Sequence, residues 1–148
     1  MSILFINGSP NPSGNTARLT AQLLAGKAYD TIELGTTKVY DYGQNFADDQ
    51  FDEVVRAMKA ADTIVFGSPM YWHSFSGMLR NLLDRCYGPI QDEFAGKRLF
   101  FVYQGAAPTR EQLDTAEWTI NRFAGLYQMR YEGMVTNAAE ARAAAARV

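Results

Sequence analysis

Small polar residues follow the first apolar run of the chain, in the segment GSPNPSGNT over residues 8–16. Hydroxyls, side-chain amides and free backbone N–H groups at the start of a helix can enclose a phosphate group, helped by the helix dipole. A triphosphate-binding loop carries a lysine directly after its second glycine, and Asn15 stands there instead. The segment therefore predicts a site for one terminal phosphate. The alternative is a polar turn whose serine or asparagine only caps the helix.

Large side chains stand in a row in a second segment, GSPMYWHSFSG over residues 67–77. Met70, Tyr71 and Trp72 follow an apolar run that predicts a buried strand. A flat, partly apolar ring would cover such side chains, while amides of the loop hydrogen-bond to its polar edge. The alternative is that Tyr71 or Trp72 packs on the protein itself or on a second subunit.

Alternating strands and helices must position these segments. The apolar pattern predicts strands over 2–7, 30–35, 62–69, 98–105 and 127–135, and helices over 15–26, 49–61, 76–88, 109–126 and 137–148. A repeat of roughly 30 residues is typical of βαβ units. We therefore expect an α/β fold, an open doubly wound parallel sheet with helices on both faces, in one domain over residues 1–148.

Such a sheet binds ligands beyond the carboxyl ends of its strands. Both segments follow predicted strands, as does a third segment over 104–109, so all three are expected at this edge. The stretch 71–77 is expected to be a loop. The alanine-rich end, 137–148, is expected to be a helix that is either frayed or docked on a partner subunit.

Composition excludes several classes of function. The net charge is −2, so the chain lacks the basic surface that nucleic acids or anionic membranes require. One cysteine, Cys86, excludes a disulfide within the chain and a cysteine cluster, and one histidine, His73, excludes a multi-histidine metal site. No run approaches the roughly 18 apolar residues of a membrane span. We expect no metal, no nucleic acid, no membrane and a cytoplasmic location.

The segments GSPNPSGNTARL and ADTIVFGSPMYWHSFSGMLRNLLDR resemble the flavodoxin-like NAD(P)H-dependent FMN reductase and quinone reductase family. The resemblance extends over nearly the whole chain and implies a five-stranded parallel sheet in the order 2-1-3-4-5. It implies FMN as the cofactor and NADH or NADPH as the co-substrate.

By position, the resemblance also implies which residues bind FMN. The phosphate would be held by Ser9, Asn11, Ser13, Gly14, Asn15 and Thr16. One side of the isoalloxazine ring would be flanked, largely through backbone atoms, by Pro69, Met70, Tyr71, Trp72 and His73. The other side would be closed by Gln104, Gly105 and Ala106.

The resulting functional hypothesis is an FMN-dependent oxidoreductase that passes electrons from NAD(P)H to a small acceptor. Quinones, azo or nitro compounds and free flavin are the candidate acceptors, and a homodimer is expected. No catalytic side chain is assigned, because the flavin supplies the chemistry. His73 either stabilises negative charge on the reduced ring or donates a proton, or it is only part of its loop. One alternative function is a non-enzymatic flavodoxin-type electron carrier, but such a carrier should be strongly negative, and the net charge of −2 argues against it. The other alternative is a binding or regulatory module that kept the fold and lost its flavin.

Other side chains have structural interpretations. Arg80 and Asp84 are four residues apart on a predicted helix, which favours a surface ion pair. Cys86 lies on the apolar side of that helix and is expected to be buried. Trp118 and Phe123 are expected to be core or dimer contacts.

Overall fold

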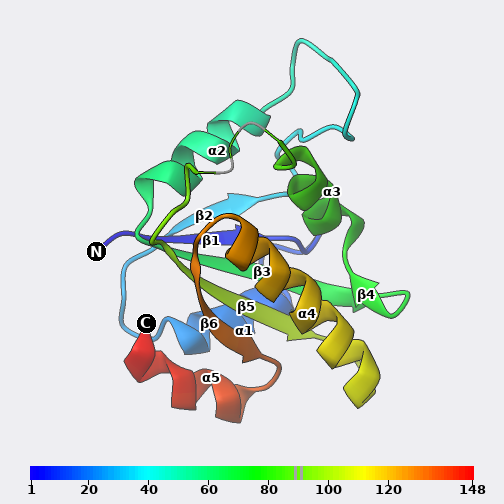
Figure 1. Ribbon diagram of the computed structural model, residues 1–148. Coiled ribbons are helices and arrows are strands. Elements are labelled where there is room, and N and C mark those ends of the chain that lie inside the picture. Colours follow the sequence, from blue (N-terminus) through cyan, green and yellow to red (C-terminus); the bar gives the residue numbers. More distant parts are fainter. Residues whose placement is uncertain (89, 91) are drawn as a thin grey trace.

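Strand order defines the fold. The computed structural model describes residues 1–148 except 89 and 91, and within these residues five parallel strands form a sheet in the order β2-β1-β3-β5-β6 (Figure 1). They are β1 (Ile3–Asn7), β2 (Asp30–Glu33), β3 (Thr63–Tyr71), β5 (Arg98–Gln104) and β6 (Arg130–Val135). In register, Phe5 lies beside Thr31 on one side and Val65 on the other. The predicted fold class is confirmed, because β5 and β6 are the fourth and fifth strands of the prediction.

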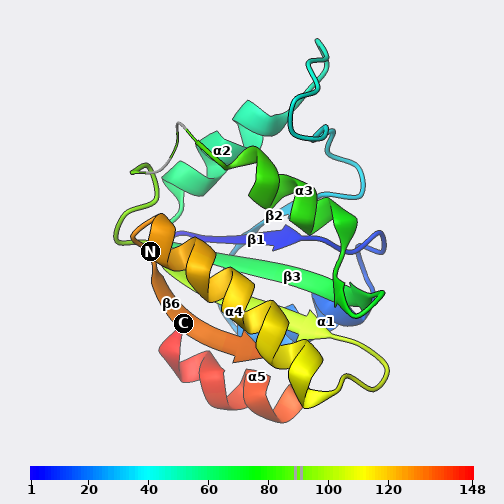
Figure 2. The same cartoon turned by 45° about the vertical axis from the view of Figure 1, so that its right-hand side comes forward.

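Helices cover both faces of this sheet. Figure 2 shows α4 (Arg110–Leu126) crossing one face, while α1 (Asn15–Leu23) lies behind the strands. The helices α2 (Phe51–Ala60) and α3 (Gly77–Arg85) share the face of α4, and α5 (Ala138–Ala144) packs beside α1. Side chains of a strand alternate between the two faces, so Phe66 enters the core under α4 and Val65 the core under α1. A strand buried on both faces must be apolar throughout, which explains its continuous apolar run.

The alanine-rich end forms an ordered helix that packs on the same chain. Ala141 and Ala144 of α5 are buried against the core under α1, and Val148, after the short 3₁₀ helix Ala145–Arg147, closes it. Lys27 Nζ donates a hydrogen bond to the carbonyl of Ala145 at 2.9 Å. Small side chains allow the helix to lie close to α1, so the segment is held despite its low apolar area.

The stretch 71–77, expected to be a loop, is partly a hairpin. The strand β3 continues to Tyr71, and the short strand β4 (Ser74–Phe75) pairs with it antiparallel, Met70 opposite Phe75 and Tyr71 opposite Ser74. The Oγ of Ser68 accepts a hydrogen bond from the N–H of Ser76 at 2.7 Å, which closes the base of the hairpin. The loop prediction was wrong for Tyr71, Ser74 and Phe75. The prediction ended the strand where residues that favour turns follow the apolar run.

Several boundaries also differ from the prediction: for example, the helix predicted over 76–88 ends at Arg85, and the strand predicted over 30–35 ends at Glu33. The last strand begins at Arg130 and not at residue 127, because Tyr127 still caps α4 and Gln128 takes a left-handed φ of 55°. The helix predicted over 15–26 ends at Leu23. These differences change the lengths of elements and leave their order intact.

The helix α3 has one buried, apolar face and one exposed, charged face. Leu79, Leu82 and Cys86 are fully buried, and burial raises the pKa of the Cys86 thiol to about 12, so the thiol stays protonated. On the outer side, Arg80 pairs with Asp84 at 3.0 Å. The predicted burial of Cys86 and the predicted surface pair are both confirmed.

Arg85, the last residue of α3, anchors the long segment over 36–49. Its guanidinium contacts both carboxylate oxygens of Asp49, donates to the carbonyl of Tyr40 at 2.9 Å, and lies 4.4 Å from the centre of the Phe51 ring. The same pairing lowers the pKa of Asp49 and raises that of Arg85. One side chain therefore fixes the segment against both α2 and α3.

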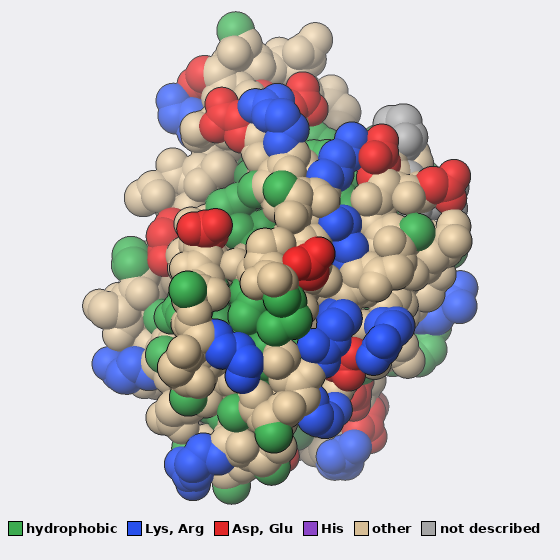
Figure 3. Space-filling model, turned by 90° about the vertical axis from the view of Figure 1, so that its left-hand side faces the viewer, with side chains coloured by type: hydrophobic (Ala, Val, Ile, Leu, Met, Phe, Trp, Pro, Cys, Tyr) green, Lys and Arg blue, Asp and Glu red, His purple; other side chains and the backbone are tan. Residues whose placement is uncertain are grey.

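The face at the amino ends of the strands carries charges of both signs. Figure 3 shows Lys and Arg side chains interspersed with Asp and Glu there, with apolar side chains between them. Among the described residues, no helix has the length and the apolar character needed to cross a bilayer. The three segments with candidate binding residues lie at the opposite ends of the strands.

Candidate functional site

A chain of hydrogen bonds shapes the first segment, residues 8–16. Glu33 accepts a hydrogen bond from the side-chain Nδ2 of Asn7 at 2.8 Å, and the side-chain Oδ1 of Asn7 accepts one from the N–H of Ser9 at 3.1 Å. The Ser9 Oγ accepts from the N–H of Asn11, whose own Oδ1 accepts from the N–H of Ser13, both at 3.1 Å. Side chains that bond to the backbone two residues on hold a loop in a fixed turn. The loop is therefore shaped before any ligand arrives.

The start of α1 presents backbone donors. Gly14 is the N-cap residue and supplies no side-chain hydrogen bond, and the first helical bond runs from the N–H of Arg18 to the Gly14 carbonyl at 3.0 Å. The N–H groups of Asn15, Thr16 and Ala17 precede that bond. The first turn of α1 also contains no acidic residue, whereas α2 begins with Asp and Glu side chains. Such a helix start favours an anion.

Arg18 adds positive charge to the same loop. Its guanidinium reaches back to the carbonyl of Ser13 at 3.1 Å and to the side-chain oxygen of Asn15. A cation beside free N–H groups strengthens the attraction for a phosphate. Arg18 is exposed to solvent, and these two contacts hold its guanidinium beside the loop.

Thr16 joins the first segment to the third. Its side chain is buried, and its Oγ1 accepts a hydrogen bond from the Gln104 amide, at the end of β5, at 3.2 Å. A hydroxyl that accepts one bond keeps its proton for another partner. Gly67 permits this approach, since a Cβ there would lie 2.8 Å from Thr16 Cγ2 and 2.6 Å from the Phe5 ring. The first and third segments are thus in direct contact across the sheet edge.

The turn of the β3–β4 hairpin has an unusual backbone. Trp72 and His73 take positive φ angles of 47° and 64°, a conformation that favours Gly or Asn and costs other residues roughly 1–2 kcal/mol each. The Trp72 side chain is 94% exposed. Strain of this kind is found at binding sites, where surrounding structure maintains it.

Below the turn, Met70 lies against the third segment. A Cβ on Gly105 would be 2.8 Å from the Cβ of Met70, so only glycine permits this contact. Pro69 is buried within β3 and pairs in register with Gln104. The second and third segments therefore also touch, and all three meet at one edge.

A cavity of about 500 Å³ opens between the hairpin and the third segment. Its lining residues are Met70, Trp72, His73, Ala106, Ala107, Thr109 and Gln112. Four of the predicted ring-binding residues are among them, namely Met70, Trp72, His73 and Ala106. The other four do not line it: Pro69, Tyr71, Gln104 and Gly105. A volume in this range suits a small-molecule site.

Sequence reasoning missed three lining residues, Ala107, Thr109 and Gln112. The signal for two of them was present in the sequence, because Thr109 and Gln112 stand three residues apart at the start of the predicted helix, which is the spacing of a capping box, and they form that box in α4. A helix that follows a strand at the carboxyl edge places its first turn beside the ligand. In addition, Gln112 Nε2 contacts His73 Nδ1, across the cavity mouth.

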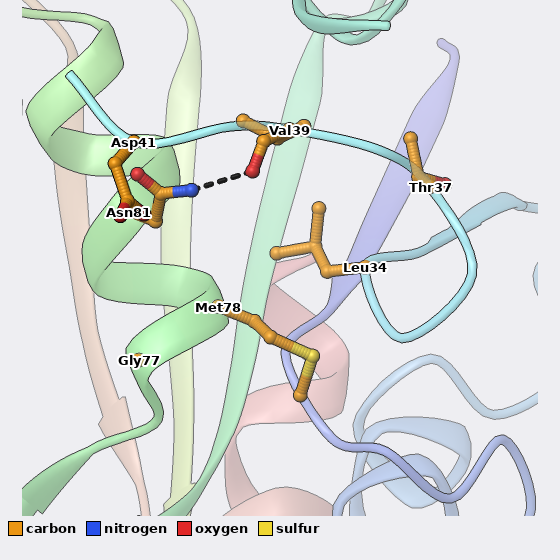
Figure 4. A pocket seen from close by; sticks show the side chains of 7 residues that line it. All are labelled: Leu34, Thr37, Val39, Asp41, Gly77, Met78 and Asn81. Carbon is orange, nitrogen blue, oxygen red and sulfur yellow. Dashed lines mark hydrogen bonds between the residues drawn. The ribbon is translucent and has the colours of Figure 1, made fainter. Parts of the chain in front are cut away.

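A second, smaller cavity lies beyond β1, between the start of α3 and the segment after β2. Figure 4 shows the side chains of Leu34 and Met78 turned toward it, and the amide of Asn81 donating to the carbonyl of Val39. Its volume is about 290 Å³, and Asp41, Thr37 and Gly77 complete its lining. No predicted binding residue lines it.

Comparison with known proteins decides the family. The family model of NADPH-dependent FMN reductases matches residues 1–140. The chain belongs to this family. An iron-sulfur flavoprotein of Methanocaldococcus jannaschii is 33% identical over 99 residues, which cover 57% of this chain and 51% of that protein. The chain spans about half the length of the curated relatives it matches.

Solved structures agree with the fold of this FMN reductase family member. The Trp repressor binding protein of Bacillus subtilis superposes with a TM-score of 0.79 at 20% identity, covering 99% of this chain and 98% of that one. A flavodoxin, WrbA-like protein of Agrobacterium tumefaciens has a TM-score of 0.70 at 18% identity, covering 99% and 93%. The predicted family is confirmed, with FMN as the cofactor and NAD(P)H as the electron donor of its members, and so is the flavodoxin-like fold.

Proposed function

We propose that this chain binds FMN and acts as an oxidoreductase that passes electrons from NADH or NADPH to a small acceptor. The observation that carries this proposal is the contact between Thr16 and Gln104, which joins a helix start suited to a phosphate with the beginning of the third segment. Two residues later in that segment, Ala106 lines a cavity of about 500 Å³. One ligand with a phosphate at one end and a flat ring at the other fits both.

The phosphate end would be held by the first segment. The N–H groups of Asn15, Thr16 and Ala17 and the Thr16 hydroxyl proton are donors, and Arg18 supplies charge. Ser9, Asn11, Ser13 and Gly14 shape the loop around these donors. A loop without lysine suits one phosphate, where a triphosphate would need more positive charge.

The ring end would lie against the second and third segments. Pro69, Met70, Tyr71, Trp72 and His73 would flank one side, and Gln104, Gly105 and Ala106 the other. Bound FMN supplies the transfer of a hydride and of electrons. The side chains bind and orient, and the cavity leaves room for a flat second reactant beside the ring.

The class of electron acceptor is inferred from the space beside the ring that the electron donor and the acceptor would occupy in turn. A quinone, an azo or nitro compound, or free flavin is flat and carries polar atoms at its edge. Met70 and Trp72 offer apolar contact, whereas Thr109 and Gln112 offer polar contact. Because donor and acceptor would use one face in turn, we expect ping-pong kinetics.

The decisive experiment combines binding with turnover. The protein is mixed with FMN and desalted, its FMN content is read from the absorbance, and NADH or NADPH oxidation is then followed with p-benzoquinone. We expect retained FMN and turnover. A fluorescence titration without binding would exclude the proposal, and binding without turnover with any acceptor would instead support an electron carrier.

We further propose that residues 1–148 act as one domain and that the protein works as a homodimer in the cytoplasm, where NAD(P)H is available. Exposed apolar side chains support the dimer. Tyr87, Trp118 and Leu126 border one groove between α3 and α4, above the buried Phe123. Trp118 is 65% exposed and therefore outside the core. Exposed apolar patches on soluble proteins commonly mark contacts with other proteins.

A further inference from the structure

Gln112 has a side-chain amide of fixed orientation. Its Oε1 accepts a hydrogen bond from the backbone N–H of Thr109 at 2.9 Å, while its own backbone N–H donates to the Thr109 hydroxyl at 3.3 Å. This is the capping box that begins α4. Because a backbone N–H must meet the oxygen end of the amide, the nitrogen end points the other way.

The nitrogen end of this amide meets His73. Gln112 Nε2 contacts Nδ1 of the imidazole. An amide nitrogen only donates, so Nδ1 must accept, and a neutral imidazole then carries its proton on Nε2. The capping box thus sets the tautomer of a side chain 39 positions earlier in the sequence. The hairpin turn holds that ring at the cavity.

We propose that His73 binds the electron acceptor by donating a hydrogen bond from Nε2–H to an acceptor oxygen, and that Gln112 is the positioning residue. This inference rests on the proposed function and narrows its acceptor to oxygen-bearing compounds of the quinone class. The side chain keeps its proton, so its role is to bind and orient.

The surroundings of His73 favour such a ligand. Met70 and Trp72 line the same cavity and offer apolar surface to a flat ring, while Nε2–H is a single directed donor beside them. Reduction places negative charge on a quinone oxygen, and a donor aimed at that oxygen becomes more favourable as the charge develops. An azo compound has no such oxygen and would gain less.

The first test reads the tautomer directly in the protein without FMN. His73 is the only histidine of the chain, so ¹⁵N labelling of histidine gives the signals of one imidazole. We expect the proton on Nε2. In Gln112→Glu a carboxylate keeps the capping box but turns an oxygen toward Nδ1, and we expect a proton on Nδ1. Gln44→Glu, an equal change in the exposed segment over 36–49, should leave the signals unchanged. A wild-type proton on Nδ1 would overturn the inference.

The second test measures how fast the NADH-reduced holoenzyme is reoxidised, by stopped flow. For p-benzoquinone we expect His73→Phe to lower kcat/KM about tenfold, mainly through KM, as for one lost hydrogen bond. His73→Gln, which retains an N–H donor, should recover part of the loss. Ferricyanide needs no such donor, so its rate should fall less than that of p-benzoquinone, and the ratio of the two rates is the readout.

The outcomes separate this inference from the function on which it rests. If FMN binds and both acceptors slow equally in His73→Phe, the assignment of His73 is wrong while the oxidoreductase remains. If the wild-type protein binds no FMN, the proposed function fails and the acceptor site fails with it. The tautomer measurement does not depend on FMN, so it tests the Gln112 contact in either case.

Discussion

Thr16 has two roles that its hydroxyl can fill at once. The oxygen accepts the Gln104 amide, and the proton remains for a phosphate oxygen. The same helix offers a comparison, because Thr20 lies one turn later, is equally buried, and has a hydroxyl without a hydrogen-bond partner among the described residues. One threonine is therefore expected to serve the ligand and the other only the core.

We expect Thr16→Val to weaken FMN binding about tenfold, because valine keeps the shape and removes one hydrogen bond to a charged group. Titration of FMN fluorescence measures the effect. Thr20→Val is the matched control and should leave the FMN affinity unchanged. Equal affinities for wild type and Thr16→Val would show that the phosphate lies elsewhere.

Local sequence could predict part of this site and not the rest. Ser9, Asn11 and Ser13 stand in one short segment beside a helix start, so their types and spacing carry the information. The contact between His73 and Gln112 joins two segments that are separate in sequence, and its existence depends on how a hairpin turns. Gln112 could be predicted as a helix cap but not as a partner of His73.

At the scale of elements, close packing of β3 on β1 and α1 depends on Gly67. A Cβ at this position would lie 2.6 Å from the Phe5 ring and 2.8 Å from Thr16 Cγ2. Real structures essentially never tolerate such distances, so either β1 or α1 would have to shift. The position of the loop over 8–16 relative to the sheet thus depends on the absence of one methyl group.

We expect Gly67→Ala to lower the free energy of unfolding by about 2 kcal/mol through overpacking, and to weaken FMN binding as Thr16 shifts. Gly125→Ala is the control within α4, where an added Cβ meets nothing within 4 Å. It should raise stability by about 0.5 kcal/mol, since alanine favours a helix. Urea denaturation measures the free energy of unfolding of both variants. A value for Gly67→Ala equal to that of the wild type would contradict the packing argument.

The pair of Arg85 and Asp49 connects α3 to the long segment before α2. Both side chains are mostly buried, at 14% and 20% exposure, and Arg85 lowers the pKa of Asp49 in the folded protein. A lowered pKa means that the ionised carboxylate stabilises the fold at pH values above the unfolded pKa, about 3.9. That stabilisation is lost as the pH falls through the lower, folded pKa.

We expect Asp49→Asn to lower the free energy of unfolding by about 1.5 kcal/mol at pH 7. The difference in this free energy between the variant and the wild type should shrink below about pH 4. Urea denaturation at pH 7 and pH 3 checks both statements. Asp114→Asn is the control, because its pair with Arg110 is far more exposed and should contribute less than about 0.5 kcal/mol. A difference that stays constant down to pH 3 would rule out this explanation.

The order of the elements was predictable, but the hairpin was not. The three central strands, β1, β3 and β5, contain continuous apolar runs, and the longer helices have an apolar stripe, so these element types follow from the pattern. The residues Ser74 and Phe75 form a strand only because Tyr71 and Met70 lie opposite. A two-residue strand has no pattern of its own, and its pairing appears only in three dimensions.

At the scale of the whole molecule, exposed apolar side chains lie on the outer surface of α3 and α4. Tyr87, Trp118 and Leu126 are exposed around a groove that also contacts Phe123. Arg80, Asp84 and Arg122 lie at the same groove and would provide a polar rim. The proposed homodimer would cover this surface.

We expect the wild-type protein to sediment at twice the chain mass of 16.5 kDa, and Trp118→Glu to sediment as a monomer, because a buried, unpaired carboxylate opposes association. Sedimentation equilibrium gives both masses. Tyr29→Glu changes an exposed aromatic residue far from this groove in sequence and should leave the dimer intact. A monomeric wild type would exclude the dimer.

At the left-handed turn of Trp72 and His73, backbone stability and the lining of the cavity favour different residues. Asn-Gly is the dipeptide that fits such a turn best, and it would relieve most of the strain in the backbone. It would also remove the indole and the imidazole from the cavity. A library of variants screened for heat resistance alone would therefore tend to select Asn-Gly here, and its most stable members would have lost the side chains that we propose for binding the acceptor.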